Sequence, residues 1–133
     1  MPRQAEVLLD TCTVIDLERI DPGPLGDAVP LLSAISVAEL ASGLDTSDPL
    51  ERHRRDERFR AILDAFDVLP FTTEAAKLYG VLCALVRQIG RDPRPRRMDL
   101  QIAATAAAHS LPLVTRNGKD FAGLERLVEI IEV

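Results

Sequence analysis

The chain has 133 residues, the size of one domain whose core can fold without disulfides or a structural metal, so we expect a single domain over residues 1–133. Hydrophobic residues make up 47% of it, with one Tyr, four Phe and no Trp, which indicates an aliphatic core. The formal net charge of −5 argues against a protein that coats nucleic acid by general charge attraction.

The first half of the chain alternates short apolar runs with helical patterns. Residues 6–9 predict a buried strand that ends at Asp10, and "TVIDLERI" predicts a short helix with Thr13 and Asp16 as a capping pair. "DPGPLGD" predicts a turn, and "LLSAI" predicts a second strand that leads into a helix ended by Gly43. After "TSDP", apolar residues at helical spacing predict another helix with arginines on its outer face.

The second half continues this alternation. "DVLPF" predicts a short strand, and the helical pattern after it is closed by Gly90. "RDPRPRR" predicts a loop because two prolines interrupt it, and "MDLQIAATAAAHSL" predicts a helix with Asp99 in its first turn. A strand "PLVT", a turn "RNGKD", a short helix "FAGLERL" and a last strand "VEIIEV" follow. Strands that alternate with helices predict a three-layer α/β/α sandwich with a small, mainly parallel sheet.

Nothing in the chain predicts association with a membrane. The stretch "LQIAATAAAHSLPLV" is broken by Gln101, His109 and Pro112, and it is shorter than the roughly eighteen apolar residues of a spanning helix. The beginning, "MPRQAE", lacks the apolar segment of a signal peptide. Cys12 and Cys83 are isolated, and free thiols are typical of a reducing compartment. We therefore expect a cytoplasmic protein.

Acidic residues follow the strands of the predicted sheet. Because the carboxyl ends of parallel strands meet at one edge, side chains at these positions are expected to share a cleft. Carboxylates gathered in this way repel one another unless a cation is present, and a hard divalent cation is their natural partner. The candidate residues at this edge are Asp10, Glu39, Asp99, Asn117 and Asp120.

Each of these acids except Asp10 also has a structural explanation. Ser36 and Glu39 have the spacing of a capping box, and Asp99 can be an ordinary first-turn helix charge. Asp120 can cap "FAGLERL". Asp10 is harder to explain as structure because it closes a buried apolar strand. The acids favour a site mainly because they occur together.

Other catalytic chemistries fit the sequence less well. A nucleophilic Asp10, as in dehalogenase-like phosphotransferases, needs an acid two positions later, and Cys12 cannot protonate a leaving group in that place. A small-molecule phosphatase is therefore disfavoured. His53 and His109 are too few for a zinc site and make a Ser–His–Asp triad improbable. "DPGPLGD" has prolines where a phosphate loop needs backbone amides.

Arginine dominates the basic residues, with 14 of the 16. Many lie in "RHRRDERFR" (52–60) and "RDPRPRR" (91–97), and the planar fork of arginine binds two phosphate oxygens at once. The first run is explained equally well as a solvated helix face, because Asp56 and Glu57 offset part of its charge. The second run lies directly before Asp99.

Four stretches, "LLDTCTVID", "ISVAEL", "RRMDLQIAATA" and "LPLVTRNGKDF", resemble in order the four motif regions of PIN-domain nucleases. The chain is most similar to the VapC-type ribonuclease toxins of bacterial toxin–antitoxin pairs, from about Val7 to the end. The resemblance implies an RNA substrate, Mg²⁺ or Mn²⁺ as cofactor, a cognate VapB-type antitoxin and a homodimer.

The resemblance also assigns roles to individual residues. Asp10 and Asp99 match the direct metal ligands, and Glu39 matches the acid that completes the pocket through water. We predict the catalytic set Asp10, Glu39, Asp99 and Asp120, supported by Thr11, Thr115 and Asn117. The arginines expected to hold RNA are Arg94, Arg96, Arg97 and Arg116.

The fourth acid is either Asn117 or Asp120. Asn117-Gly118 is a turn signal because both residues tolerate positive φ, which explains Asn117 without a metal. An amide oxygen is also a poorer ligand for a hard cation than a carboxylate. We therefore predict Asp120, which comes just before a core-anchoring Phe121. Cys12 departs from the family's commoner serine or asparagine and is expected to point away from the site.

The leading hypothesis is a metal-dependent endoribonuclease toxin in which water activated by the metal cuts RNA, leaving a 5′-phosphate and a 3′-hydroxyl. Its antitoxin is expected to insert an Arg or Lys between Asp10 and Asp99. The alternative is a non-catalytic PIN-like module that binds RNA or a protein. The homodimer is expected to use aliphatic residues such as Leu40 and Leu44 on the early helices.

Overall fold

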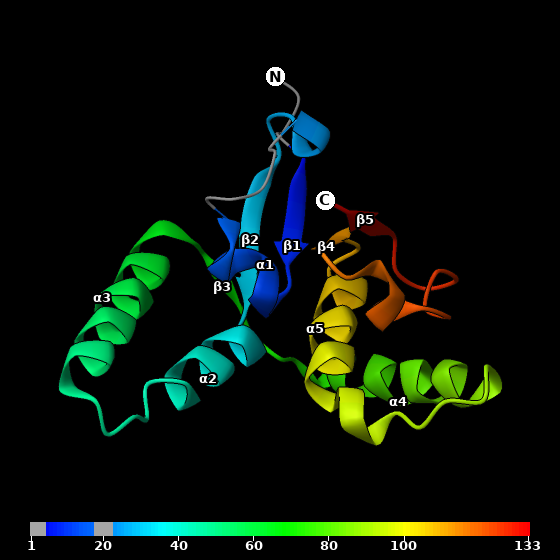
Figure 1. Cartoon of the computed structure of the whole chain (residues 1–133). Helices are drawn as coiled ribbons and strands as arrows, with labels where there is room; N and C mark the ends of the chain where they lie inside the picture. Colours follow the sequence, from blue (N-terminus) through cyan, green and yellow to red (C-terminus); the bar gives the residue numbers. More distant parts are fainter. Residues whose placement is uncertain (1–4, 18–22) are drawn as a thin grey trace.

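Five short strands form one sheet in the order β3-β2-β1-β4-β5, and all neighbouring strands are parallel (Figure 1). The computed structural model describes residues 5–17 and 23–133. The central strand β1 places Leu8 opposite Leu31 of β2 and Leu113 of β4. The strands are β1 (Glu6–Leu9), β2 (Val29–Ser33), β3 (Val68–Leu69), β4 (Leu113–Thr115) and β5 (Ile130–Glu132).

Helices connect the strands, as parallel pairing requires. The α-helices are α1 (Thr11–Ile15), α2 (Ala34–Ser42), α3 (Pro49–Ala65), α4 (Thr73–Gln88) and α5 (Arg97–Ala108). Short 3₁₀ turns are η2 (Gly23–Leu25), η3 (Arg94–Arg96) and η4 (Gly118–Phe121). Among residues 5–17 and 23–133, no helix is both long and apolar enough to cross a membrane.

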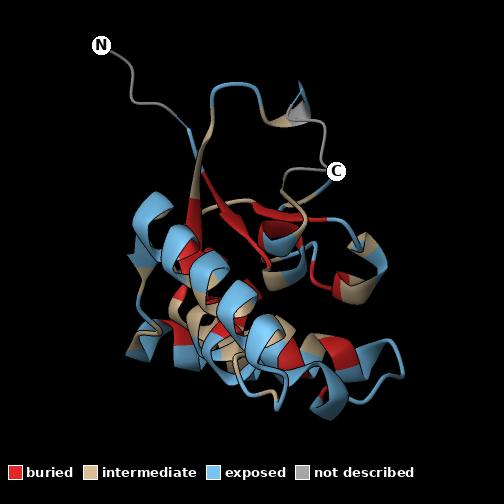
Figure 2. Cartoon of the chain, turned by 60° about the vertical axis from the view of Figure 1, so that its left-hand side comes forward, coloured by how far each residue is buried: buried red, intermediate tan, exposed pale blue. Residues whose placement is uncertain are grey.

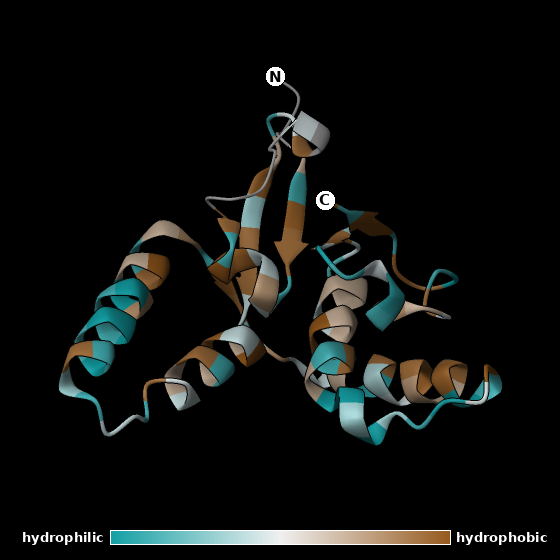
Figure 3. Ribbon diagram, in the orientation of Figure 1, coloured by the Kyte–Doolittle hydropathy of each residue, from teal (hydrophilic) through white to brown (hydrophobic). Residues whose placement is uncertain are grey.

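Alternate side chains of β1 pack into two separate cores. Leu8 lies in a cluster with residues of α4 and α5, such as Leu82 and Ile102. Val7 and Leu9 lie in a second cluster, which includes Val14 of α1, Leu40 of α2 and Ile62 of α3. Because successive side chains of a strand point to opposite faces, the two clusters lie on opposite faces of the sheet. The predicted three-layer α/β/α sandwich is confirmed, and the buried, apolar strands lie in its middle (Figures 2 and 3).

The outer helix α3 carries the first arginine run. Ile62 is its one buried residue, and its outward face is exposed and hydrophilic (Figures 2 and 3). Its charges pair along the helix, with Arg55 Nε 3.0 Å from Glu51 Oε1 and Arg60 Nε 3.1 Å from Asp56 Oδ2. These contacts support the reading of "RHRRDERFR" as a solvated helix face.

The strand order contains a reversal beside β1. From β1 the chain adds β2 and β3 on one side, and then returns to add β4 and β5 on the other side. Ligands of parallel α/β sheets bind at such a switch point, outside the carboxyl ends of the strands. Here Asp10 follows β1 and Thr115 ends β4, so both residues stand at this position.

Two predicted helix caps are wrong, and the reason is the same for both. Helix α1 begins directly after β1, so Asp10 is its N-cap, and the pair of Thr13 and Asp16 is not a capping pair. Helix α2 begins directly after β2, with Ser33 as its N-cap, so Ser36 and Glu39 do not form a capping box. Each helix starts as soon as its strand ends, which leaves no loop residues to carry the expected cap.

The segment after β4 also differs from the prediction. The expected helix "FAGLERL" is absent, because η4 ends at Phe121 and Gly123 has a φ of +90° that interrupts a right-handed helix. Asp120 lies inside η4 and caps nothing that follows. Phe121 is 1% exposed and anchors this segment in the core, as predicted.

The predicted positive-φ turn at Asn117-Gly118 is wrong as well. Asn117 has a φ of −127°, and Gly118 is not in the left-handed region. Gly118 has another reason to lack a side chain. Its amide donates to Glu132 Oε1 at 2.8 Å, and a Cβ there would lie 3.1 Å from the same oxygen.

Replacing either of two glycines around α4 by alanine is expected to change the stability of the protein in opposite directions. Gly90 follows the helix with a φ of +78°, whereas Gly80 lies inside it and a Cβ there would meet nothing within 4 Å. We expect Gly90→Ala to destabilise the protein by about 1 kcal/mol. Gly80→Ala is expected to stabilise it by up to about 1 kcal/mol. Urea unfolding of both variants checks this, and equal effects of the same sign would contradict it.

Candidate active site

Asp10 is held at the switch point by both of its carboxylate oxygens. Its side chain is buried, with 5% exposure. Oδ1 accepts from the amide of Thr13 at 2.9 Å, and Oδ2 accepts from the hydroxyl of Thr115 at 2.6 Å. A buried carboxylate is stable only with such donors. These two bonds fix the orientation of Asp10 relative to the ends of β1 and β4.

Thr115 links Asp10 to the following turn. Its fully buried hydroxyl donates to Asp10 and accepts from the backbone amide of Asn117 at 3.0 Å. Asn117 therefore contributes its backbone to the support of Asp10, while the residue itself is exposed.

Thr115→Val preserves shape but leaves Asp10 Oδ2 without its donor. We expect the free energy of unfolding to fall by about 1–3 kcal/mol, the cost of an unsatisfied buried group. Thr105→Val is the matched control, because Thr105 is equally buried but donates at 3.0 Å to Gln101 of its own helix. We expect that change to cost less than about 1 kcal/mol. Denaturant unfolding of the two variants compares them, and a larger loss in Thr105→Val would contradict the assignment.

Glu39 projects from α2 and is bound by the first helix. The hydroxyl of Thr11 donates to Glu39 Oε1 at 2.7 Å and lies 2.9 Å from the hydroxyl of Ser36. Ser36 was not among the predicted site residues, although its position three residues before Glu39 places it on the same face of α2. This spacing was the signal that could have revealed it.

Asp99 lies in the first turn of α5, where burial and the charges of the other acids change its pKa. Burial is the main reason that the pKa of Asp99 is raised from 3.8 to about 6, and the charges of Asp10, Asp120 and Glu39 raise it further. Arg96 acts in the opposite direction. The structure thus brings together four acidic side chains that the chain separates widely, from the β1–α1 junction, α2, α5 and η4.

Arg96 lies between two of these acids. Its Nη2 is 3.0 Å from Asp120 Oδ1, and its Nη1 is 3.7 Å from Asp99 Oδ2. The side chain of Arg96 is half exposed. A guanidinium group therefore partly neutralises the cluster from its solvent side.

The other three predicted RNA-binding arginines lie differently. Arg94 Nη2 is 2.8 Å from Asp92 Oδ2, and Arg116 Nη1 is 3.1 Å from Asp16 Oδ2. Arg97 is exposed at the start of α5. Of the predicted set, the structure brings Arg96 alone into ion pairs with the acidic cluster, within the part of the chain that it describes.

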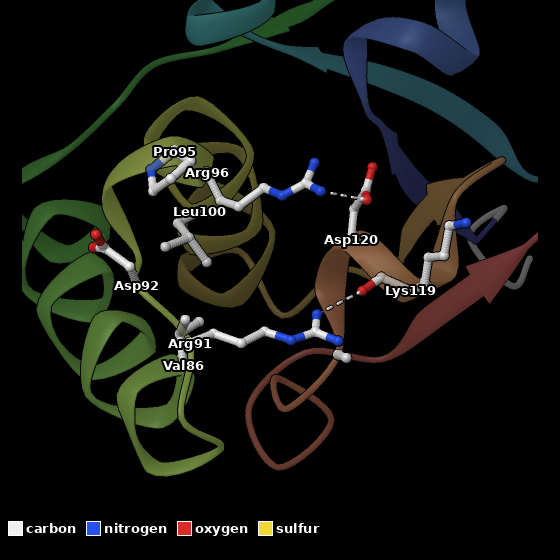
Figure 4. A pocket seen from close by; sticks show the side chains of 9 residues that line it. Val86, Arg91, Asp92, Pro95, Arg96, Leu100, Lys119 and Asp120 are labelled. Atoms are coloured by element: carbon white, nitrogen blue, oxygen red, sulfur yellow. Dashed lines mark hydrogen bonds and ion pairs between the residues drawn. The ribbon is translucent and has the colours of Figure 1, made fainter.

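Two cavities flank the cluster. One, of about 300 Å³, is lined by Glu39 and Asp99 together with Cys12, Arg55 and Arg58. Cys12 therefore faces the acids, contrary to the prediction, and burial followed by the charge of Asp10 raises the pKa of its thiol. The second cavity, of about 420 Å³, lies on the side of Asp120 (Figure 4). Arg55, Arg58 and Cys12 were not predicted as lining residues.

The donor chemistry of the cluster suits a hard divalent cation. Burial and, after it, the charges of the neighbouring carboxylates raise the pKa of Asp99, so a cation nearby would relieve their repulsion. Within residues 5–17 and 23–133, no three His, Cys, Asp or Glu side chains form a group that could enclose a metal ion. Mg²⁺ retains several waters and is often bound by only one or two carboxylates, so a pair such as Asp10 and Asp99 could hold it.

The chain is thus a parallel α/β protein whose acidic side chains gather at the switch point of the sheet, where proteins of this class bind their ligands. Residues 7–127 match the PIN domain family, and the chain belongs to this family. The resemblance seen in the four sequence motifs is confirmed.

The known proteins that this chain resembles match it over nearly its whole length. Ribonuclease VapC5 of Mycobacterium tuberculosis is 33% identical over an alignment of 132 residues that covers 95% of this chain and 94% of that protein. A crystal structure of VapBC-5, a VapBC-family toxin–antitoxin system from the same organism, superposes with a TM-score of 0.83 at 31% identity, covering 97% and 99% of the two chains. FitAcB from Neisseria gonorrhoeae gives 0.72 at 28% identity, over 95% and 96%.

Proposed function

We propose that this chain is the ribonuclease toxin of a toxin–antitoxin pair, and that it hydrolyses RNA phosphodiester bonds with Mg²⁺ or Mn²⁺. The observation that carries the proposal is the gathering of Asp10, Glu39, Asp99 and Asp120 at the switch point of the sheet. The ribonuclease and toxin–antitoxin relatives supply the substrate class and the biological role. The chain would act in the cytoplasm as one domain of residues 1–133.

Asp10 and Asp99 are the proposed metal ligands. A divalent cation, when bound, lowers the pKa of water and offsets the negative charge that builds on the phosphate. Asp10 is positioned for this role by the Thr13 amide and the Thr115 hydroxyl, and Thr115 is held in turn by the Asn117 amide.

Glu39 is the proposed general base. Its carboxylate is oriented by the Thr11 hydroxyl at 2.7 Å, and its second oxygen accepts a proton from the attacking water. In-line attack by this water breaks the bond between phosphorus and the 3′ oxygen and leaves the phosphate on the 5′ end of one RNA fragment. The released 3′ oxygen takes up a proton from solvent to become the 3′-hydroxyl of the other fragment. Thr11 acts through Glu39 as a positioning residue.

Asp120 is the proposed fourth acid, rather than Asn117. The charge of Asp120 acts on Asp99, whereas Asn117 is exposed and contributes its amide to Thr115. At limiting magnesium, we expect Asp120→Asn to lower cleavage by roughly tenfold or more, and Asn117→Ala to lower it little. Initial rates of both variants measure this. If Asn117→Ala abolished cleavage while Asp120→Asn retained it, the assignment would be reversed.

Arginines near the cluster would hold the RNA backbone against an otherwise repulsive acidic site. Arg96 and Arg97 stand at the start of α5 beside Asp99. Arg94 and Arg116 are paired with Asp92 and Asp16, so each would have to exchange a carboxylate for a phosphate to take part. These exposed ion pairs are weak, so the exchange costs little.

The proposed partner is a cognate VapB-type antitoxin that places an Arg or Lys between Asp10 and Asp99. Arg96, between Asp99 and Asp120, supports the fit of a guanidinium group in this cluster. A complex whose acidic cluster stays open to bulk water would contradict the insertion.

A homodimer remains a proposal drawn from the family resemblance. Leu40 is 8% exposed and belongs to the core, so it does not provide the expected contact surface, whereas Leu44 is partly exposed. Sedimentation at micromolar concentration tests the homodimer, and a monomer under these conditions would contradict it.

Incubating total RNA with the protein and Mg²⁺, and then with a chelator, tests the proposed function. We expect cleavage that the chelator stops. A non-catalytic PIN-like module would bind RNA or a protein without cutting, and a phosphatase would release phosphate from small esters instead. Absence of chelator-sensitive cutting by well-folded protein would contradict a metal-dependent ribonuclease.

A further inference from the structure

We propose that the cavity on the Asp120 side binds one unpaired nucleotide of the RNA, next to the bond that is cut. We name it the arginine pocket, and its lining includes Val86, Arg91, Arg96, Leu100, Asp120 and Ala122. The inference rests on the proposed ribonuclease function and adds to it a binding site for the substrate. Arg91, which the sequence analysis assigned no individual role, becomes a substrate-binding residue.

Three basic and two acidic residues line the pocket, and two of the basic ones are arginines that reach across it. Both reach from the α4–α5 connection toward η4, with Leu100 between them (Figure 4). Arg96 pairs with Asp120 at 3.0 Å, and Arg91 Nη1 donates to the carbonyl of Lys119 at 3.3 Å. The Lys119 contact leaves further N–H groups of the exposed Arg91 guanidinium to bind a phosphate oxygen.

The floor of the pocket is apolar. Leu100 and Val86 are buried at its base, with 1% and 6% exposure, and the more accessible Pro95 and Ala122 complete the apolar lining. The volume of about 420 Å³ is within the range of small-molecule sites. A flat base can lie on this surface and stack against a guanidinium plane, as unpaired bases do in RNA complexes. The pocket therefore offers separate surfaces for the base and the phosphate of one nucleotide.

The pocket is continuous with the acidic cluster. Asp120 and Arg96 belong to both, and Arg96 also reaches Asp99 at 3.7 Å. A nucleotide held here would place its neighbouring phosphate beside Asp99. This continuity favours the substrate over an unrelated ligand.

Charge favours RNA over the proposed antitoxin as the occupant. The charged lining residues are three basic and two acidic, namely Arg91, Arg96, Lys119, Asp92 and Asp120. This excess of positive charge opposes an antitoxin segment that brings an Arg or Lys to the pocket. Single-stranded RNA brings negative phosphates to the same arginines. Binding of a protein segment instead is an outcome that the experiment below distinguishes.

The experiment compares Arg91→Gln with Arg87→Gln in the full chain. Both changes remove one exposed arginine charge, but Arg87 lies four residues earlier and does not line the pocket. Anisotropy of a short, labelled, single-stranded RNA of mixed sequence in chelator measures affinity without cleavage. We expect Arg91→Gln to bind this RNA about tenfold more weakly. The slope of the logarithm of the binding constant against the logarithm of the salt concentration should also become shallower by about one. Arg87→Gln should remain close to wild type.

Ala122→Phe tests the apolar surface without changing charge. We expect weaker RNA binding with an unchanged salt dependence, and a changed nucleotide preference at one position beside the cleavage sites. With Mg²⁺, both pocket variants should raise KM and leave kcat nearly unchanged, because the pocket binds without reacting. Should Ala122→Phe fail to fold, the exposed Arg91→Gln still decides the question.

The outcomes separate the two proposals. Wild-type protein that neither binds nor cuts RNA refutes the proposed function itself. Wild-type protein that cuts RNA, with Arg91→Gln equal to Arg87→Gln in affinity and KM, overturns the pocket and leaves the ribonuclease intact. Loss of antitoxin binding in Arg91→Gln with RNA binding unchanged also overturns it, because the pocket would then belong to a protein partner.

Discussion

Asp99→Asn is expected to lower RNA cleavage by on the order of a hundredfold or more while the protein folds normally. The substitution keeps the shape of the side chain and removes the charge that we propose to hold the cation. Burial is the main reason that the pKa of Asp99 is raised to about 6, and the neighbouring acids add to it, so ionised Asp99 is held at a cost in the metal-free protein. Full cleavage activity in Asp99→Asn, or a collapse of its folding, would refute the assignment.

Stability should respond to the same substitution with a defined sign. An acid with a raised pKa in the folded state binds its proton more tightly there than in the unfolded chain. The metal-free protein therefore loses stability as the pH rises from 3.8 to about 6, where folded Asp99 ionises. We expect Asp99→Asn to remove this loss and to stabilise the protein by about 1 kcal/mol at neutral pH. Urea unfolding of both proteins in chelator, across this pH range, checks the sign.

Asp10→Ala is expected to abolish cleavage and also to destabilise the fold by about 2–4 kcal/mol. The change removes the N-cap of α1 and leaves the buried hydroxyl of Thr115 without its acceptor. Asp16→Ala is the control, because Asp16 makes a solvent-exposed pair with Arg116 and should cost under about 1 kcal/mol. Thermal and urea unfolding of both variants compare them, and similar losses would contradict the structural role of Asp10.

Asp10 and Asp99 thus differ in what they contribute, although both are proposed metal ligands. Asp10 is bound by groups from two chain segments, and the fold depends on those bonds. Asp99 is held near like charges that oppose its ionisation. Comparing activity with stability in the two variants therefore separates a structural acid from one retained for chemistry.

The fold was predictable because its signals are local and repeated. Strand β1 covers residues 6–9 as predicted, and the alternation of strands with helices predicted the layers. The helix caps were misread because the capping patterns at Thr13 and Ser36 can be recognised in sequence, whereas the position where a strand ends depends on its neighbours in the sheet. The expected helix "FAGLERL" does not form because Gly123 has a positive φ, and the periodicity of apolar residues does not reveal such a backbone conformation.

The acidic cluster was predictable because strand ends share an edge, but the contacts of the arginines around it were not. Arg116 pairs with Asp16, which is about a hundred positions away along the chain, and only the folded sheet brings the two residues together. The local pair of Arg94 with Asp92 was accessible in principle, because the two residues are only two positions apart. Cys12 faces the acids because α1 begins directly after Asp10.

Mapping the ends of the RNA fragments tests the central claim most directly. Cleavage of one defined single-stranded RNA by the full chain with Mg²⁺ is compared with the same reaction in chelator and with Asp99→Asn. We predict fragments with a 5′-phosphate and a 3′-hydroxyl, formed by wild-type protein with Mg²⁺ and lost in both comparisons. Fragments with a 5′-hydroxyl and a cyclic phosphate, or cleavage that persists in chelator and in Asp99→Asn, would contradict hydrolysis at the acidic cluster.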